Sequence, residues 1–168
     1  MKKLAKLLST VFLCATVSGS ALAMSSSEMA IGGITPGSSL NYVESIYGTP
    51  DKTQSARNNH SIAYWGHGFN MTIRPNGLVN YVTTSANNGL GTPAGLAVGQ
   101  KIQVMYDLYG TPSHSYNSNG YTNHYYKNHF DDGDRSHFIN MEVKEKKGKI
   151  AEIICFESYE GPYTPADF

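Results

Sequence analysis

Cysteine is nearly absent from this chain of 168 residues, which contains only Cys14 and Cys155. Two cysteines cannot build the disulfide framework that stabilises many small secreted domains, so a hydrophobic core must hold the fold together. Charge is also scarce, because Asp, Glu, Lys and Arg make up 15% of the residues, against about a quarter in average proteins. After residue 23 no apolar run approaches the ~20 residues that a membrane-spanning helix needs. We therefore expect no integral membrane span.

Residues 1–23 have the pattern of a secretory signal peptide. Lysines at the start precede an apolar stretch, and Ala21 and Ala23 supply the small residues that signal peptidase requires. We predict that the chain is secreted or periplasmic after this segment is removed. The alternative is cleavage before Cys14 and attachment of a lipid anchor to it. That alternative is disfavoured, because the preceding residue, Leu13, is not small.

The processed chain carries a negative net charge. All 13 acidic residues lie after residue 23, whereas three of the 13 Lys and Arg residues lie before it, so the net charge after processing is 10 minus 13, or −3. A negative net charge argues against electrostatic binding to nucleic acid or to an anionic membrane. We expect no nucleic-acid partner.

The chain contains an internal repeat at an offset of 62 residues, 96 minus 34. Residues 34–50 match residues 96–112, and the match is closest where Tyr-Gly-Thr-Pro recurs. In each copy, apolar residues at three- and four-residue spacing predict a short helix. Glycine and proline then end the helix, because glycine adopts the required turn and proline cannot continue a helix. The predicted helix ends are Gly48 and Pro50 in the first copy and Gly110 and Pro112 in the second.

Segments rich in β-branched and aromatic residues follow each predicted helix. They predict antiparallel strands at 61–65, 69–74, 78–84, 121–126, 137–144 and 149–156. The expected fold is α+β, with two tandem repeats that each consist of a short helix followed by a sheet of three or four antiparallel strands. The helix residues expected to face the sheets are Leu40, Val43, Ile46 and Tyr47 in the first repeat, and Ile102, Met105, Leu108 and Tyr109 in the second.

The expected organisation of the chain follows from these assignments. It consists of a signal peptide at 1–23, a flexible N-terminus at 24–30, repeat unit 1 at 31–86, a linker at 87–94, repeat unit 2 at 95–157 and a C-terminal tail at 158–168.

A short helix that ends in Gly-x-Pro and precedes a small antiparallel sheet, present twice, resembles the superfamily of the secreted β-lactamase inhibitor proteins and the lipoprotein BamE. The resemblance implies their fold, a concave sheet face and binding of another protein. It assigns no contact residue. The inhibitors contain disulfides that this chain lacks, and BamE is a lipidated single copy. The residues that carry the resemblance are Gly37, Val43, Ile46, Gly48 and Pro50, then Gly99, Met105, Leu108, Gly110 and Pro112.

Aromatic residues are frequent on the predicted strands. Tyrosine and tryptophan are enriched in binding hot spots, because they offer a large rigid surface at a small entropic cost. We therefore predict a non-catalytic binding module that recognises a protein or a cell-envelope component. The predicted partner-binding residues are Tyr64, Trp65, Phe69, Tyr121, Tyr125 and Tyr126, together with Asp132 and Arg135 of an inserted loop.

Two other functions stay open. Imidazole and carboxylate groups could bind a metal ion or small ligand in the loop at 124–137, although the spacing matches no known ligand motif and we predict no metal and no cofactor. An enzyme acting on the envelope is the second alternative, and no nucleophile elbow supports it. The candidate ligands of the loop are His124, His129, His137 and Asp131.

Overall fold

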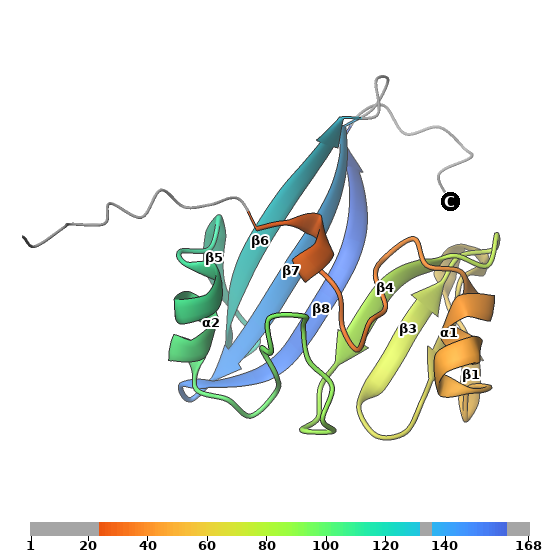
Figure 1. Cartoon of the computed structure of the whole chain (residues 1–168), viewed down its shortest axis with the longest axis horizontal. Helices are drawn as coiled ribbons and strands as arrows, with labels where there is room; N and C mark the ends of the chain where they lie inside the picture. Colours follow the sequence, from red (N-terminus) through yellow and green to blue (C-terminus); the bar gives the residue numbers. More distant parts are fainter. Residues whose placement is uncertain (1–23, 132–135, 161–168) are drawn as a thin grey trace, which may run out of the picture.

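In the described part of the chain, the strands form one antiparallel sheet of eight, in the order β1-β2-β3-β4-β8-β7-β6-β5 (Figure 1). The structure is a computed structural model that describes residues 24–131 and 136–160. Its elements are η1 Ser26–Glu28, α1 Leu40–Tyr47, β1 Lys52–Ser55, η2 Arg57–Asn59, β2 Ser61–Tyr64, β3 Phe69–Ile73, β4 Val79–Thr84, α2 Ile102–Tyr109, β5 His114–Ser118, β6 Tyr121–Asp131, β7 Ser136–Lys146 and β8 Lys149–Glu160.

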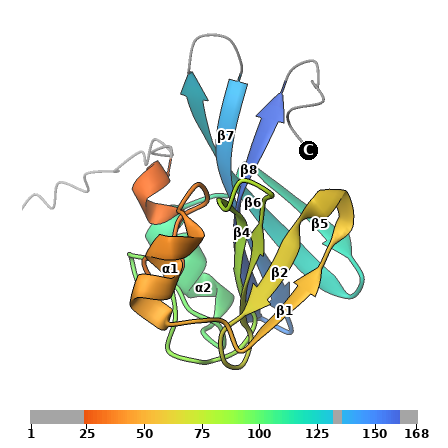
Figure 2. The same ribbon diagram turned by 90° about the vertical axis from the view of Figure 1, so that its right-hand side faces the viewer.

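Both α-helices lie on the same side of the sheet. Figure 2, turned by 90°, shows α1 and α2 together on one face, whereas no described helix covers the other face. We call this second surface the helix-free face. Within residues 24–131 and 136–160, no helix is long and apolar enough to cross a membrane.

The expected fold of two tandem repeats with separate small sheets is wrong. β4 pairs with β8 from Tyr81↔Phe156 to Thr84↔Ile153, and this pairing joins the strands of both halves into a single sheet. The physical reason is that a strand at a sheet edge leaves a row of backbone N–H and C=O groups unpaired, and pairing two such edges satisfies them. Periodicity in the sequence identifies a strand but not the strand that pairs with it.

β1 and β5 form the two outer edges of the sheet, and the sequence predicts neither of them. Their sequences are polar, KTQS and HSYNS, and all of their residues are exposed. An edge strand that adds nothing to the core lacks the apolar alternation from which strands are predicted. The other six strands lie within or overlap the predicted segments.

The core lies between the sheet and the two helices. Val43 of α1 and Met105 of α2 are fully buried, whereas Ile46 and Leu108 are 47% and 40% exposed. The expectation that Ile46 and Leu108 face the sheet is therefore wrong. Leu40, Tyr47, Ile102 and Tyr109 do pack against the core, as expected. They lie on one side of the buried residue around each helix, whereas Ile46 and Leu108 lie about 60° away on its other side. Residues 24–30 also contribute to the core, because Met29 is fully buried.

The same backbone hydrogen bonds attach both helices to the sheet. Gly37 N donates to Val79 O, and Leu40 N donates to Gly77 O, each at 2.8 Å. These bonds tie the entry to α1 to the β3–β4 turn. The corresponding bonds at α2 run from Gly99 N to Ile150 O at 2.8 Å and from Ile102 N to Gly148 O at 3.0 Å.

Candidate binding face

Strand alternation divides the predicted aromatic residues between the two faces of the sheet. Trp65, Phe69 and Tyr126 point towards the helices and are 6%, 2% and 3% exposed. They belong to the core, which corrects the prediction that they lie on a partner-binding surface. The reason is that successive side chains of a strand point to opposite faces, and the sequence does not show which face the helices cover.

The buried rings have a structural role at the helix ends. Trp65 donates its Nε1–H to the carbonyl of Gly48, and Tyr126 donates its hydroxyl to the carbonyl of Gly110, each at 2.9 Å. Burial raises the pKa of the Tyr126 hydroxyl far above its ordinary value. A tyrosine held neutral in this way acts as a hydrogen-bond donor, so the ring anchors the chain that leaves α2.

The helix-free face carries a cluster of three rings at its centre. Tyr81 of β4 stacks on Phe156 of β8, with ring centroids 5.0 Å apart and an interplanar angle of 11°. Tyr125 of β6 meets the same Phe156 ring edge-on at 5.8 Å. Tyr81 is 37% exposed, whereas Phe156 and Tyr125 are half-buried. We call Tyr81, Phe156 and Tyr125 the aromatic cluster.

Sequence reasoning found only one member of this cluster, Tyr125. Tyr81 and Phe156 lie on strands 75 positions apart (156 minus 81), and they become neighbours only through the β4–β8 pairing. The alternation of β4, in which Val82 is buried and Tyr81 is exposed, marks Tyr81 as an outward residue. That signal could have found Tyr81 but not its partner ring.

Further aromatic residues flank the cluster. Tyr64 of β2 donates a hydrogen bond to Gln54 at 3.1 Å, and Lys52 lies over its ring at 5.8 Å. At the other margin, Tyr116 of β5 donates to Glu142 at 3.1 Å. A pocket of about 340 Å³ lies at this margin. Its lining residues are Tyr116, Ser118, Asn119, Tyr121, Asn123, Glu142 and Lys144.

An ion pair lies on this face, between β7 and β8. Lys144 Nζ lies 2.5 Å from Glu152 Oε2. Burial alone would lower the pKa of Lys144, but the hydrogen bond and the charge of Glu152 raise it above its ordinary value. The lysine therefore stays protonated. The face presents rings, hydroxyls and amides rather than an excess of one charge.

His124, the candidate metal ligand whose side chain is described, is already engaged. Its Nδ1 lies 3.0 Å from Ser115 Oγ and its Nε2 lies 3.1 Å from Glu145 Oε2, and the residue is 3% exposed. Metal binding would break one of these contacts. The side chains of His129, His137 and Asp131 lie outside the described residues. Among the residues that are described, no group of three or more His, Cys, Asp and Glu could hold a metal ion.

The serine, histidine and glutamate form a hydrogen-bonded line of the kind found at nucleophilic sites. Ser115, His124 and Glu145 line neither the pocket beside Tyr116 nor the pocket beside the end of α1. Cys155 offers no alternative nucleophile, because it is fully buried and burial raises the pKa of its thiol far above the ordinary value.

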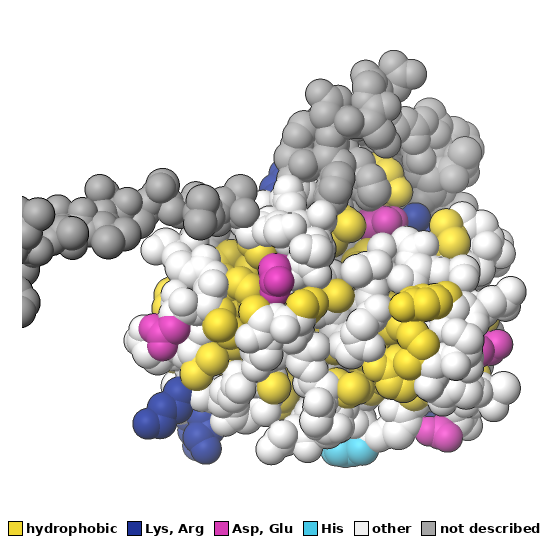
Figure 3. All heavy atoms as spheres, in the orientation of Figure 1, with side chains coloured by type: hydrophobic (Ala, Val, Ile, Leu, Met, Phe, Trp, Pro, Cys, Tyr) yellow, Lys and Arg dark blue, Asp and Glu magenta, His cyan; other side chains and the backbone are white. Residues whose placement is uncertain are grey.

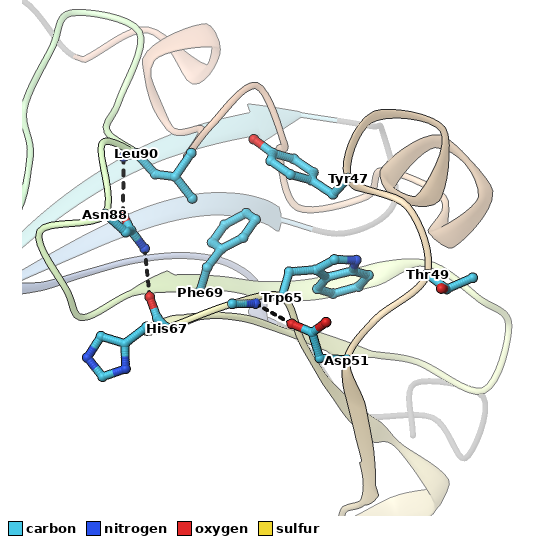
Figure 4. Close-up of a pocket in the computed structure, with 9 residues that line it drawn as sticks. Tyr47, Thr49, Asp51, Trp65, His67, Phe69, Asn88 and Leu90 are labelled. Carbon is cyan, nitrogen blue, oxygen red and sulfur yellow. Dashed lines mark hydrogen bonds between the residues drawn. The ribbon is translucent and has the colours of Figure 1, made fainter.

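A second pocket, of about 360 Å³, opens beside the end of α1 (Figure 4). Asp51 Oδ2 accepts a hydrogen bond from Gly66 N at 2.6 Å, and Asn88 Nδ2 donates to His67 O at 3.1 Å. These polar groups hold the surrounding loops, and the His67 imidazole points away from the pocket. The side chains of Asp51 and Asn88 are therefore already engaged with the backbone. It is lined by Tyr47, Thr49, Asp51, Trp65, Gly66, His67, Phe69, Asn88 and Leu90.

Several residues named from the sequence lie outside the described residues. They are the signal peptide at 1–23 with Cys14, the loop residues Asp132 and Arg135, and the tail beyond residue 160.

No protein-family model matches the chain, and no curated protein matches it. Similar solved structures include an extracellular protein containing a SCP domain from Bacillus anthracis str. Ames, with a TM-score of 0.51 and 8% identity over 79% of this chain and 51% of that chain. A cysteine-rich secretory protein from Staphylococcus aureus subsp. aureus Mu50 has a TM-score of 0.50 and 12% identity, over 76% and 46% of the two chains. The likeness is one of fold. This chain spans about half the length of either solved chain.

The expected resemblance to the β-lactamase inhibitor proteins and BamE is therefore wrong. The structural neighbours are a SCP-domain protein and a cysteine-rich secretory protein instead. The residues that carried the resemblance, such as Gly48 and Pro50, specify how a short helix ends and meets a sheet. That local arrangement also fits a continuous eight-stranded sheet, so it does not identify a superfamily.

Proposed function

We propose that the processed chain is a secreted, non-catalytic binding module that recognises a protein or another cell-envelope component through its helix-free face. The observation that carries this proposal is the aromatic cluster, in which Tyr81 stacks on Phe156 and stays 37% exposed. Rings held in place by neighbouring rings lose little entropy when a partner covers them. Hydroxyl, amide and paired charged groups around the cluster supply hydrogen bonds of the kind found at the rim of an interface.

Secretion is supported by two independent observations. Residues 1–23 have the lysine, apolar and small-residue pattern of a signal peptide. The solved structures of similar fold are described as an extracellular protein and a secretory protein. We expect a bacterial host to export the full chain and to release a product that begins at Met24. Intact-mass measurement of the exported protein tests this, and a cytoplasmic product that retains residue 1 would contradict it.

The binding face is tested by removing exposed rings. The exported protein, immobilised, is used to capture partners from envelope extract, and the captured material is compared between wild type, Tyr81→Ala and the double variant Tyr81→Ala with Tyr125→Ala. Hot-spot residues contribute about 2 kcal/mol or more, so we expect capture by the double variant to fall at least about tenfold.

The matched control is Tyr42→Ala. Tyr42 is 49% exposed on α1, on the opposite side of the sheet, so its removal takes away a similar ring without touching the helix-free face. Thermal unfolding of all variants checks that they fold. Unchanged capture by the folded double variant, or an equal loss in Tyr42→Ala, would rule out the helix-free face as the binding surface.

A further inference from the structure

Four lysines meet at the end of the sheet where β7 turns into β8. Lys146 pairs with Lys149 across this turn, and Lys147 lies within it. Lys101, just before α2, forms an isolated bridge with Lys149. All four residues are exposed, and Figure 3 shows dark blue side chains gathered at the lower left, below α2. We call these four residues the lysine tip.

The positive charge of the lysine tip is not neutralised locally. Glu145 is the acidic residue adjacent in sequence, which leaves four minus one, or +3, on these five residues. That carboxylate accepts hydrogen bonds from Gly148 N at 3.2 Å and from His124 at 3.1 Å. Within the described part of the chain, none of the four ammonium groups forms an ion pair, and Lys146 lies over the ring of Tyr121 at 4.9 Å.

The fold itself does not require these lysines. The other half of the sheet builds the same junction, with a bridge between Ser39 and Leu78 where the second half has Lys101 and Lys149. Asn76 occupies the turn position that corresponds to Lys147 at the offset of 71, 147 minus 76. The same backbone hydrogen bonds thus form with uncharged side chains. Like charges placed together repel one another, so their presence calls for an explanation other than stability.

We propose that the lysine tip docks on a membrane surface that contains anionic phospholipids. Four ammonium groups on flexible stems at a convex turn suit a spread-out layer of negative headgroups better than one phosphate, which would need a cradle of fixed donors. The Tyr121 ring beneath Lys146 is of the amphipathic type that lies at the headgroup level of membranes. Each lysine near such a surface strengthens binding about fivefold.

The overall charge of −3 does not oppose this docking. At physiological ionic strength charges interact over about 8 Å, so a membrane surface senses the lysine tip and not the acidic residues elsewhere on the molecule. This replaces the expectation, drawn from net charge alone, that an anionic membrane is not a partner. The tip lies at the ends of β7 and β8, so docking there covers the Tyr121 margin of the helix-free face and leaves the aromatic cluster open to its own partner.

The test is co-sedimentation of the exported protein with vesicles. We expect binding to vesicles of phosphatidylcholine with phosphatidylglycerol, loss of binding in high salt, and no binding to phosphatidylcholine alone. The double variant Lys147→Ala with Lys149→Ala should bind about 25-fold more weakly, at about fivefold per lysine. The double variant Lys147→Arg with Lys149→Arg keeps the charge and should bind like wild type.

The matched control removes two positive charges elsewhere. Lys52→Ala with Arg57→Ala changes exposed residues on β1 and η2, and we expect it to bind like wild type. Equal weakening in this control, salt-insensitive binding, or equal binding to neutral vesicles would overturn the proposal. Binding to soluble polyphosphate without binding to vesicles would also overturn it and identify a soluble polyanion as the partner. These outcomes are independent of the Tyr81 and Tyr125 variants.

Discussion

At the scale of single residues, Gly48 and Gly110 have backbone angles that other residues rarely adopt. Their φ and ψ are 75° and −170°, and 68° and −153°. This region is almost exclusive to glycine and differs from the left-handed helical region that commonly follows a helix. A Cβ placed at either position would meet no atom within 4 Å. A side chain there therefore costs free energy through strain in the backbone torsion angles, and not through steric contact with a neighbour.

We expect Gly48→Ala and Gly110→Ala each to lower the free energy of unfolding by about 1–3 kcal/mol. Urea denaturation measures the loss. Ser45→Ala, on the exposed side of α1, is the control and should stay within about 0.5 kcal/mol of wild type. A loss at Gly48 no larger than at Ser45 would show that the torsional argument fails.

Burial of a tyrosine makes the free energy of unfolding depend on pH in the alkaline range. Burial raises the pKa of Tyr109 to about 12, although the hydrogen bond with Thr92 lowers it somewhat. In the unfolded chain the same group loses its proton near pH 10, while the folded chain keeps it. The unfolded state is then favoured, so the free energy of unfolding falls as the pH rises from about 10 towards 12. Urea titrations over this range should show a shallower decline in Tyr109→Phe, and an identical decline would contradict the assignment.

At the scale of elements, the two helices begin differently. Ser39 Oγ accepts a hydrogen bond from Tyr42 N at 3.2 Å and caps α1, whereas Lys101 at the same position of α2 makes no side-chain cap. Helices of eight residues have little stability of their own. A cap therefore matters to both, and α2 depends more strongly on its contacts with the sheet.

Ser39→Ala should destabilise the protein by about 0.5–2 kcal/mol, because it leaves a backbone N–H of α1 without a partner. Lys101→Ser should stabilise it by a similar or smaller amount, because it supplies the missing cap. Lys101→Ala is the control for simple loss of the lysine. Midpoints of urea denaturation measure all three, and equal midpoints for Lys101→Ser and Lys101→Ala would contradict the capping argument.

At the scale of the whole molecule, the two halves are connected across β4 and β8. Arg74, just after β3, lies 2.5 Å from Glu157 of β8 and donates to Asn80 at 2.7 Å. The side chains of Arg74 and Glu157 are 19% and 7% exposed. A largely buried charge that loses its partner is costly. This ion pair therefore supports the junction that makes the sheet continuous.

Glu157→Gln should lower the free energy of unfolding by about 1–3 kcal/mol, since the Arg74 guanidinium stays partly buried without its counter-charge. Urea denaturation measures the loss.

The wild type should unfold in a single transition when followed by both circular dichroism and fluorescence, because one sheet spans both halves. Two separate transitions, with Glu157→Gln affecting only one of them, would show that the halves are independent.

The sequence by itself determined two short helices that end at Gly48 and Gly110, and six of the eight strands in the described residues. It did so because helical periodicity, strand propensity and the torsional freedom of glycine act between neighbours in the chain. Only the tertiary structure decided which strand edges pair, and with that the stacking of Tyr81 on Phe156. It also decided that Trp65 is buried while Tyr64 lies on the other face, since strand alternation is known from sequence but the helix-covered face is not. The tertiary structure also brings Lys101 and Lys149 together in the lysine tip. They are 48 residues apart, 149 minus 101, and become neighbours through backbone pairing, which no local sequence pattern encodes.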